Sequence, residues 1–355
     1  MEKLVIEWKQ EGNKLFFEFK DTEIYFIMPD DFKLEDTHPD LLKLSEWLMF
    51  SPWYDVLGDY KFSRIGGGDI GLSFSTGVDS TACMIALPDD THLVYVQRDG
   101  FTDTLMKQDN ALHFIKYLEE KEKRKVHVIK TNFEMIRTNF KLMPGYSTGM
   151  GMGVPTVLLA DYLNLGIISF GKVLDDQFFP SGVFRDYPKG DYVFREELLN
   201  SCGLHGIHPF VGASEVITTQ VVDNSPYKYL AYSCIRGTLG KQCNNCYKCY
   251  RKNLLRGLPT NLTPLINSFF DYEPLKMATS LLYGFNQYNV LPEKLSFLKG
   301  IDVSVLNKIY PRAYRFNDSF DQEWIFNKLK ELGFELMNEE ECDYLESLDF
   351  RRKNG

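Results

Sequence analysis

The chain has 355 residues, of which 44% are hydrophobic and 25% are charged, and its formal net charge at pH 7 is −9. This length can bury a large core and suggests two or more domains, and the composition is that of a soluble globular protein. The acidic balance argues against non-specific nucleic-acid binding, which needs a basic face. No run of about 18 uncharged apolar residues is present, so no membrane span is expected. An odd cysteine count without a secretory signal pattern favours a reducing cytoplasm.

Residues 1–66 are expected to form a β-rich extension. Apolar and polar residues alternate over 4–8, 14–19 and 23–28, with turns between them, which predicts a β-meander. A helix is expected at 38–50. The glycine-rich segment 64–69 is interpreted as a hinge or turn, the alternative being a backbone that approaches a ligand.

Residues 67–256 are expected to form an α/β domain. Strands are predicted at 70–74, 93–96, 126–129 and 166–170, and helices at 80–87, 104–122 and 154–163. This alternation is typical of a parallel sheet, whose ligands bind beyond the carboxyl ends of the strands. The segments that follow the four strands, at 75–80, 97–98, 132 and 172–176, are therefore expected to surround one crevice.

The first of these segments reads Ser73-Phe74-Ser75-Thr76-Gly77-Val78-Asp79-Ser80. A strand, a loop rich in Ser and Gly and a helix start can bind phosphate, because loop amides and the helix N-terminus present N–H groups and a positive dipole end. The hydroxyls of Ser75 and Ser80 can donate to the anion, and Gly77 allows close approach and any unusual φ. Asp79 could hold Mg²⁺ or cap the helix. The alternative is a polar turn without a ligand.

Three further groups after the strands carry charge or invite a catalytic interpretation. Lys172 could stabilise phosphate charge or simply lie at the surface. Asp175 and Asp176 could bind Mg²⁺ or a guanine-like edge, the alternative being a solvated acidic turn. His205 and His208 could serve a metal or acid–base chemistry, but a loop that leads into a helix at 214–222 is favoured.

Four cysteines lie close together at Cys234, Cys243, Cys246 and Cys249. Two overlapping C-x-x-C units and one upstream cysteine can supply four thiolates to a tetrahedral ion, for which zinc is the natural occupant. Nearby cations, among them Arg251 and Lys252, would offset its charge. An iron–sulfur cluster, a redox pair and unrelated thiols are the alternatives. Cys83, Cys202 and Cys342 have no partner pattern.

Taken together, these residues resemble the 7-cyano-7-deazaguanine synthase (QueC) family, which belongs to the ATP-pyrophosphatases with an SxGxDS phosphate loop (PP-loop). The resemblance runs from about residue 71 to residue 256. It is carried by 75–80, by Gln97-Arg98, by 169–176, and by Ser233-Cys234 with the three later cysteines. The cysteine spacing is the most specific of these signals.

The resemblance implies an adenine nucleotide α-hydrolase-like fold and an ATP-dependent ligase with ATP, Mg²⁺ and Zn²⁺ as cofactors. The implied ATP-binding residues are Ser73, Ser75, Thr76, Gly77, Val78, Asp79, Ser80, Gln97 and Arg98, with catalytic roles for Ser75, Asp79, Ser80 and Lys172. The implied substrate-binding residues are Gly171, Lys172, Asp175, Asp176 and Arg185. The implied zinc ligands are the four clustered cysteines, which leave no open position for catalysis.

The chain also departs from the family pattern. Thr76 stands where the family loop has its first glycine, and segment 178–186 replaces the family's substrate segment. Met150-Gly151-Met152-Gly153 stands where an Arg-Asn pair is expected. The chain therefore looks like a diverged relative of the type found in antiphage gene clusters. There, related enzymes join a deazaguanine to something other than ammonia.

Residues 257–355 are expected to form a helical extension, with helices at 275–283, 293–297 and 320–332 and a charged, solvated one at 339–353. It could cover the active site or dock a protein partner or a second subunit. The expected partners are a carboxylate such as 7-carboxy-7-deazaguanine and an amine, either ammonia or a group on a protein. A tRNA-modifying PP-loop enzyme and a catalytically inactive nucleotide sensor are the alternatives to this ligase.

Overall fold

The computed structural model describes residues 2–102, 105–137, 144–186, 196–315, 317 and 319–352. Its contacts divide the chain into two compact units. Unit 1 comprises Met1–Ser75, Leu87–Phe170 and Tyr192–Ile207, and unit 2 comprises Thr76–Ala86, Gly171–Asp191 and His208–Gly355. The expected segments 1–66, 67–256 and 257–355 stay a prediction.

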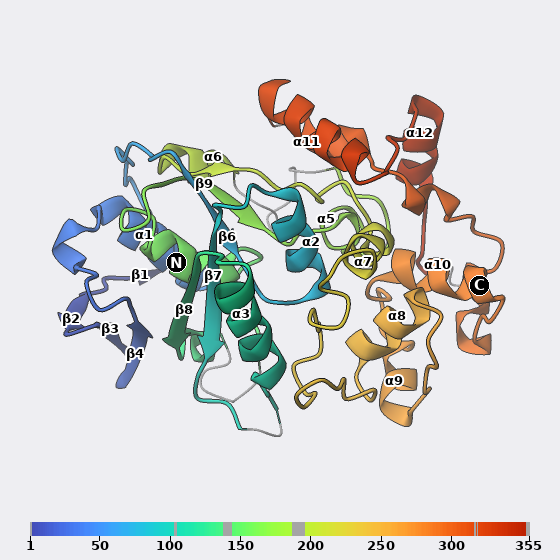
Figure 1. Ribbon diagram of the computed structural model, residues 1–355, viewed down its shortest axis with the longest axis horizontal. Coiled ribbons are helices and arrows are strands. Elements are labelled where there is room, and N and C mark those ends of the chain that lie inside the picture. The colour runs from blue at the N-terminus through green and yellow to red at the C-terminus, as the bar shows by residue number, and fades with distance from the viewer. Residues whose placement is uncertain are drawn as a thin grey trace. The chain divides into compact units, whose positions relative to one another are not determined.

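Unit 1 is built on an eight-stranded sheet (Figure 1). Its strands, in spatial order, are β10 (His205–Gly206), β9 (Leu165–Phe170), β6 (Asp69–Ser73), β7 (His92–Arg98), β8 (Val126–Thr131), β4 (Thr22–Ile27), β3 (Lys14–Phe19) and β2 (Lys9–Glu11). The first five are parallel and the last three are antiparallel. The chain is thus a mixed α/β protein, as expected, and the four predicted parallel strands are confirmed. A separate pair joins β1 (Glu2–Lys3) to β5 (Tyr54–Asp55).

The N-terminal meander continues the parallel sheet, because β4 pairs with β8 through Phe26 and Ile27. β3 and β4 confirm the second and third expected strands, and their turn places Lys20 and Asp21 at positive φ. The first expected strand, at 4–8, is wrong: exposure alternates along it, but it pairs with no neighbouring strand. Only the three residues of β2 reach β3.

Helices of unit 1 pack on this sheet. α3 (Asp109–Lys121) packs on β8, α4 (Val154–Leu158) on β6 and β7, and α1 (Pro39–Phe50) on α4. α6 (Glu196–Ser201) follows later in the chain and packs on β10. Two of these helices are shorter than expected. Gln108 brackets the Arg98 backbone, donating to its carbonyl oxygen and accepting from its N–H, so α3 begins only afterwards. Residue 104 of the expected helix lies outside the described residues.

The backbone of the glycine-rich segment 64–69 packs directly against the backbone of other segments, so the segment is not the expected hinge. A Cβ on Gly66 would lie 2.1 Å from the carbonyl oxygen of Gly203, and one on Gly67 would lie 2.1 Å from that of Asn164. Arg64 anchors the segment, since it is buried and donates to Asp161 and to several backbone carbonyls. Only glycine fits such close approach.

Unit 2 is mostly helical. Its helices are α2 (Val78–Ala86), α5 (Leu174–Phe178), α7 (Glu215–Asp223), α8 (Tyr247–Leu255), α9 (Pro264–Phe269), α10 (Ala278–Tyr288), α11 (Ser319–Glu331) and α12 (Glu339–Ser347). The short 3₁₀ segments η4 (Glu293–Leu298), η5 (Ser304–Asn307) and η6 (Pro311–Tyr314) connect the later ones. α2 packs on α7, and α8 packs on α7, α9 and α10. Ser214 caps α7 by accepting a hydrogen bond from the Val216 N–H.

The C-terminal helix is shorter and less solvated than expected. α12 ends at Ser347 rather than continuing to 353, and it buries Cys342 and Leu345. The following chain turns inward, where the Phe350 N–H donates to the Gly182 carbonyl at 2.7 Å. The run of charged residues predicted only the exposed face of α12. The apolar residues between them determine how the helix and the chain after it pack.

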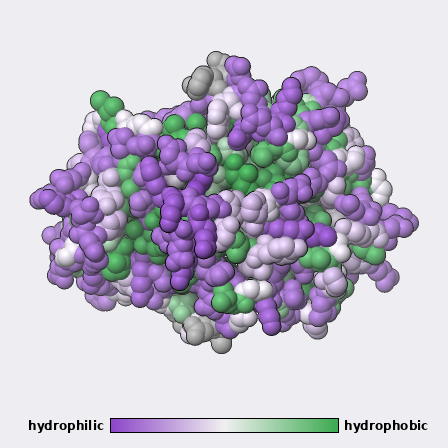
Figure 2. Space-filling view, viewed as in Figure 1, coloured by the Kyte–Doolittle hydropathy of each residue, from purple (hydrophilic) through white to green (hydrophobic). Residues whose placement is uncertain are grey.

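In the described residues, no helix combines the length and the apolar character needed to cross a membrane. Figure 2 shows hydrophilic residues over most of the face in view, with apolar residues scattered among them.

Candidate functional site: the loop before α2 and the cysteine cluster

The expected phosphate loop connects β6, which ends at Ser73, to α2, which begins at Val78. Ser75 is exposed, whereas Ser80 is buried and its hydroxyl donates to the Gly77 carbonyl at 3.1 Å. Ser80 thus helps to shape the first turn of α2, whereas Ser75 lies at the surface. The strand, loop and helix start expected here are confirmed, and phosphate binding by them stays a prediction.

The unusual backbone conformation expected at Gly77 falls on Thr76, whose φ is +59°. A left-handed φ costs a residue with a Cβ roughly 1–2 kcal/mol, and a β-branched side chain is rarer there still. Thr76 is nevertheless buried and held in this conformation. Its position is the one where the resembled family has glycine, so the loop keeps the backbone shape that a glycine would give. Strain of this kind gathers at functional sites.

Gly171, which directly follows β9, lies against the start of α2. A Cβ at this position would lie 2.7 Å from the Ser80 nitrogen and 2.8 Å from its Cα. These are backbone atoms, which cannot move without moving the helix. The lack of a side chain at Gly171 is therefore what lets this chain segment pass beside the loop.

Gly171→Ala should destabilise the protein by about 1–3 kcal/mol, because the new methyl group forces the first turn of α2 to shift. Chemical denaturation measures this change. Gly68→Ala is the matched control, since a Cβ there meets nothing within 4 Å, and it should stay within about 0.5 kcal/mol of the wild type. Equal effects of the two substitutions would show that the close approach at Gly171 is not real.

Asp79, in the first turn of α2, is held by two partners from later helices. Its Oδ1 accepts a hydrogen bond from the Thr218 hydroxyl at 2.6 Å and lies 3.0 Å from Lys252 Nζ. Lys252 is almost fully buried, with 3% of its side chain exposed, whereas Asp79 keeps 24% exposed. Both contacts use Oδ1, so Asp79 is fixed on one side and open on the other.

Lys252 also belongs to a buried ion cluster that it forms with Glu215 and Arg251. Glu215, on α7, lies 2.9 Å from Arg251 Nη2 and 3.3 Å from Lys252 Nζ, and all three side chains are at most 8% exposed. Burial alone would raise the pKa of Glu215, but Arg251 and Lys252 outweigh it and hold that pKa well below its ordinary value. Burial likewise lowers the pKa of Lys252, and Asp79 and Glu215 raise it above the ordinary value. Arg251 and Lys252 were expected to offset the charge of a metal centre, but their main partners are the carboxylates of Glu215 and Asp79.

The two acidic residues after Lys172 have different environments. Asp175 is buried and accepts hydrogen bonds from the Thr279 and Ser280 hydroxyls, from the Ser280 N–H at 3.2 Å and from the Glu215 N–H at 2.8 Å. It ties α7 and α10 to α5, so its carboxylate is used by the fold. Asp176 is exposed at the surface.

Lys172 and Arg185 are the remaining predicted residues of this group. Lys172 is half-buried, and burial lowers its pKa although Asp176 opposes the shift. Arg185 is also half-buried, and its N–H donates to the Phe178 carbonyl at 2.7 Å. The catalytic role of Lys172 and the substrate-binding roles of Gly171, Lys172, Asp175, Asp176 and Arg185 stay predictions.

The residues predicted after β7 and β8 belong to unit 1. The Arg98 guanidinium lies 3.0 Å from Glu134 and 2.9 Å from the Tyr146 hydroxyl, and it stacks 5.2 Å from that ring centroid. Asn132 accepts from the Tyr25 N–H and donates to the Glu23 carbonyl, which joins β4 to the end of β8. Gln97 is half-buried. The contacts of Arg98 and Asn132 serve the packing of unit 1, so the single crevice expected from four segments stays a prediction.

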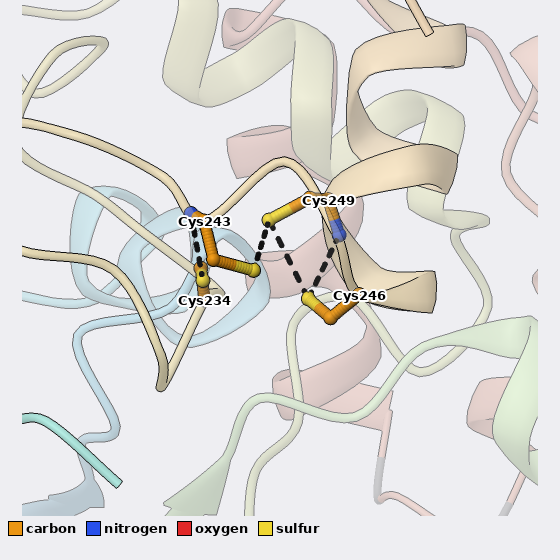
Figure 3. A group of neighbouring side chains, drawn as sticks. All are labelled: Cys234, Cys243, Cys246 and Cys249. Carbon is orange, nitrogen blue, oxygen red and sulfur yellow. Dashed lines mark hydrogen bonds between the residues drawn. The ribbon is translucent and has the colours of Figure 1, made fainter. Parts of the chain in front are cut away.

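The four clustered cysteines come together as their spacing predicted. All four Sγ atoms lie within 4.8 Å of one another, and Figure 3 shows the side chains gathered into one group. Cys249 Sγ lies 3.7 Å from Cys243 Sγ and 3.5 Å from Cys246 Sγ. Cys246 also caps α8, because its sulfur accepts from the Cys249 N–H at 3.5 Å.

This arrangement could hold a metal ion. Four sulfurs at about 2.3 Å from one zinc ion are about 3.8 Å apart at the corners of a tetrahedron, close to the spacing seen here. The N–H groups of Cys243 and Asn245 point at Cys234 and Cys243 sulfurs, at 3.4 Å and 3.5 Å, and would stabilise thiolates. Sulfurs so close together leave room for one ion between them and little for a multi-iron cluster.

A small recess lies between the start of α2 and the cysteine segments. It is shallow and encloses no space for a water molecule, and Val78, Ser233, Lys248, Lys252 and Arg256 are among its lining residues. The Val78 N–H donates to the Ser233 hydroxyl at 3.2 Å. Lys252 is paired with Asp79 and Glu215, and Arg256 with Asp223, so the N-terminus of α2 beside them is the feature that favours an anion.

Comparison with protein-family models gives a match in the second half of the chain. The chain is similar to a family of unknown function, DUF6395, over residues 195–349, which is less than half of its length. No curated protein matches the chain. The matched region contains the four cysteines, Glu215 and α8, and the loop at 73–80 lies outside it.

Several residues of this site were not predicted from the sequence in their observed roles. Ser233, Glu215, Thr218 and Lys252 contact the loop or the buried cluster, and they come from segments far along the chain. The only signal for them was the concentration of basic residues after Cys246. That signal predicts that the segment is positively charged, but it does not predict which carboxylates the basic side chains contact.

Proposed function

We propose that this protein is an ATP-dependent ligase that adenylates a carboxylate, releases pyrophosphate and couples the carboxylate to a nitrogen nucleophile. The observation that supports this most strongly is the recess at the start of α2, where Lys248, Lys252 and Arg256 stand beside a loop of the SxGxDS type. Such a surface suits the phosphates of a nucleotide. Asp79 keeps 24% of its side chain exposed, which suits a magnesium ligand at the same loop.

In the proposed reaction, a carboxylate oxygen attacks the α-phosphorus of ATP. The bond from that phosphorus to the oxygen bridging to the β-phosphate breaks, and pyrophosphate leaves with the electron pair. An amine nitrogen then attacks the acyl carbon, loses a proton and expels AMP. Lys172 would stabilise charge that develops on the phosphate, so catalysis is positioning and electrostatics rather than a covalent intermediate on the protein.

The proposed substrate is 7-carboxy-7-deazaguanine or a similar carboxylate, by the resemblance described above. Ammonia as nucleophile would give an amide; a second ATP would then adenylate the amide oxygen, and loss of AMP and two protons would give a nitrile. An amine on a protein would instead give a conjugate, which suits a role in antiphage defence. Asp176 and Arg185 are the proposed substrate contacts in unit 2. Zinc in the cysteine cluster would be structural, because four thiolates leave no open coordination position.

The test incubates the purified protein with ATP, Mg²⁺ and 7-carboxy-7-deazaguanine, with and without ammonia, and identifies products by mass spectrometry. We expect AMP and pyrophosphate together with an amide or nitrile base. An adenylated base without an amide or nitrile would support the adenylation step and show that the amine acceptor is missing. No AMP under any of these conditions would contradict the ligase and favour a nucleotide sensor.

Asp79→Asn should lower AMP formation by about 100-fold or more, because the magnesium ligand and the anchor of the loop are lost together. Asp161→Asn is the matched control, since Asp161 has a similar exposure of 27% and likewise pairs with a buried cation, Arg64. Both variants should lose stability, measured by thermal unfolding, but only the first should lose turnover. Equal losses of turnover would assign the effect of Asp79 to folding.

A further inference from the structure

The cysteine-bearing segments touch the loop before α2 at two places. The Ser233 hydroxyl accepts from the Val78 N–H at 3.2 Å, and Lys252 Nζ lies 3.0 Å from Asp79 Oδ1. Ser233 directly precedes Cys234, and Lys252 follows Cys249 by one turn of α8. These two residues, which contact the first turn of α2, thus lie close in sequence to members of the cysteine cluster.

The chain that leads to α8 has little besides the cysteines to hold it in place, whereas α8 itself also packs on α7, α9 and α10. Between residues 231 and 246 the chain has no helix and only an isolated bridge between Thr238 and Lys241. α8 has nine residues, which is too short to be stable by itself, and its N-cap is the sulfur of Cys246. An ion that joins four sulfurs would fix both the approach of Ser233 and the start of α8.

The recess described above is lined from both sides of this junction. Val78 comes from α2, and Ser233, Lys248, Lys252 and Arg256 come from the cysteine-bearing segments. Arg256 is oriented by Asp223, whose Oδ1 lies 2.7 Å from its Nη2. The loop by itself offers backbone N–H groups, and the cysteine-bearing segments supply the cations.

We infer that the metal centre controls phosphate binding at the loop, because it positions Ser233 and Lys252 as the second wall of that site. The ligand is the pyrophosphate group of a nucleotide or free pyrophosphate. Lys252 acts as a positioning residue through Asp79, and Ser233 exchanges its bond from the Val78 N–H for a bond to a phosphate oxygen. The inference rests on the proposed assignment of the loop, and it adds a role for the metal beyond folding.

The experiment measures pyrophosphate and Mg²⁺–ATP binding by titration calorimetry on the full chain, with metal content determined on the same samples. Ser233→Ala and Lys252→Met keep all four cysteines and should retain one metal ion per chain. Each should weaken pyrophosphate binding by about 10- to 100-fold, Ser233→Ala because a hydrogen bond to a charged group is lost and Lys252→Met because Asp79 loses the cation that fixes it. Lys241→Met removes an exposed lysine of the same segment that does not line the recess, and it should bind as the wild type does.

Removal of the metal by a chelator should abolish pyrophosphate binding while circular dichroism shows that the chain stays folded, and added Zn²⁺ should restore it. Metal-free, folded protein that binds as tightly as the metallated form would overturn the inference. Unchanged binding in both Ser233→Ala and Lys252→Met would overturn it as well, even if chelation unfolds the chain.

The formation of AMP, measured in parallel, separates this inference from the proposed ligase. Metal-dependent pyrophosphate binding without AMP under any condition would keep the inference and contradict the ligase. AMP formation, together with pyrophosphate binding that neither metal removal nor the two substitutions change, would contradict the inference and keep the ligase. Wild-type protein that binds neither pyrophosphate nor ATP would overturn both.

Discussion

Glu215→Gln is expected to destabilise the protein by about 3–5 kcal/mol, the cost of leaving buried cations without their counter-ion. Glu215 is the carboxylate shared by Arg251 and Lys252, and only 3% of its side chain is exposed. The amide keeps the shape but removes the charge, so two cations remain buried with less compensation. Lys252 would then depend on Asp79 alone.

The pH dependence of this effect follows from the pKa of Glu215, which Arg251 and Lys252 hold below its ordinary value against the opposing effect of burial. A depressed folded-state pKa means that the ion cluster stabilises the protein fully above the ordinary glutamate pKa of about 4.3. That contribution is lost as pH falls below this value, because the unfolded state takes up the proton first. The difference between wild type and variant should therefore be largest near pH 7 and shrink below about pH 4.

Urea denaturation at several pH values measures both effects. Glu331→Gln is the control, because Glu331 is 67% exposed and pairs only with Lys328, and its loss should cost less than about 1 kcal/mol. A double variant with Arg251→Met should be destabilised by less than the sum of the two single changes, since the two residues interact directly. Additive effects, or a cost of Glu215→Gln no larger than the control, would contradict the buried ion cluster.

Cys249→Ser is expected to remove the bound metal and lower the unfolding temperature by about 5–10 °C. Cys249 is the central member of the cluster, with a sulfur 3.5 Å from that of Cys246 and 3.7 Å from that of Cys243. Its loss leaves three thiols and frees the start of α8. Elemental analysis should find one zinc ion per wild-type chain and much less in the variant.

Cys342→Ser is the control for this substitution. Cys342 is buried in α12 and lies outside the cluster, so its replacement can lower stability but should leave the metal content at one ion per chain. Visible absorption by the purified protein, with iron in place of zinc, would show that the site holds an iron–sulfur cluster instead. Wild-type protein without any metal would contradict the site itself.

Local sequence patterns predicted most of unit 1. Alternating residues located β3 and β4, and the apolar runs before polar loops located β6, β7, β8 and β9. Each of these signals lies within one element, where the side-chain period of a strand is set by the backbone alone. A boundary failed where a side-chain contact decides it, as the hydrogen bonds of Gln108 to the Arg98 backbone do before α3.

The cysteine cluster was predictable for a different reason. Cys243, Cys246 and Cys249 are separated by a spacing that a metal site imposes on the local chain, so the pattern carries its own geometry. Residues without such spacing gave no comparable signal. Asp175 reads as a candidate ligand in the sequence, and only the positions of Thr279 and Ser280 show that it holds helices together.

The sequence by itself therefore determined β3, β4, the four parallel strands β6 to β9, the loop before α2 and the four-cysteine group of this protein. Only the tertiary structure decided which side chains meet at that loop. Asp79 and Lys252 are 173 positions apart, and Val78 and Ser233 are 155 apart. A periodic pattern records the face that a residue presents, whereas a contact across such a separation depends on the path of all the chain between its partners.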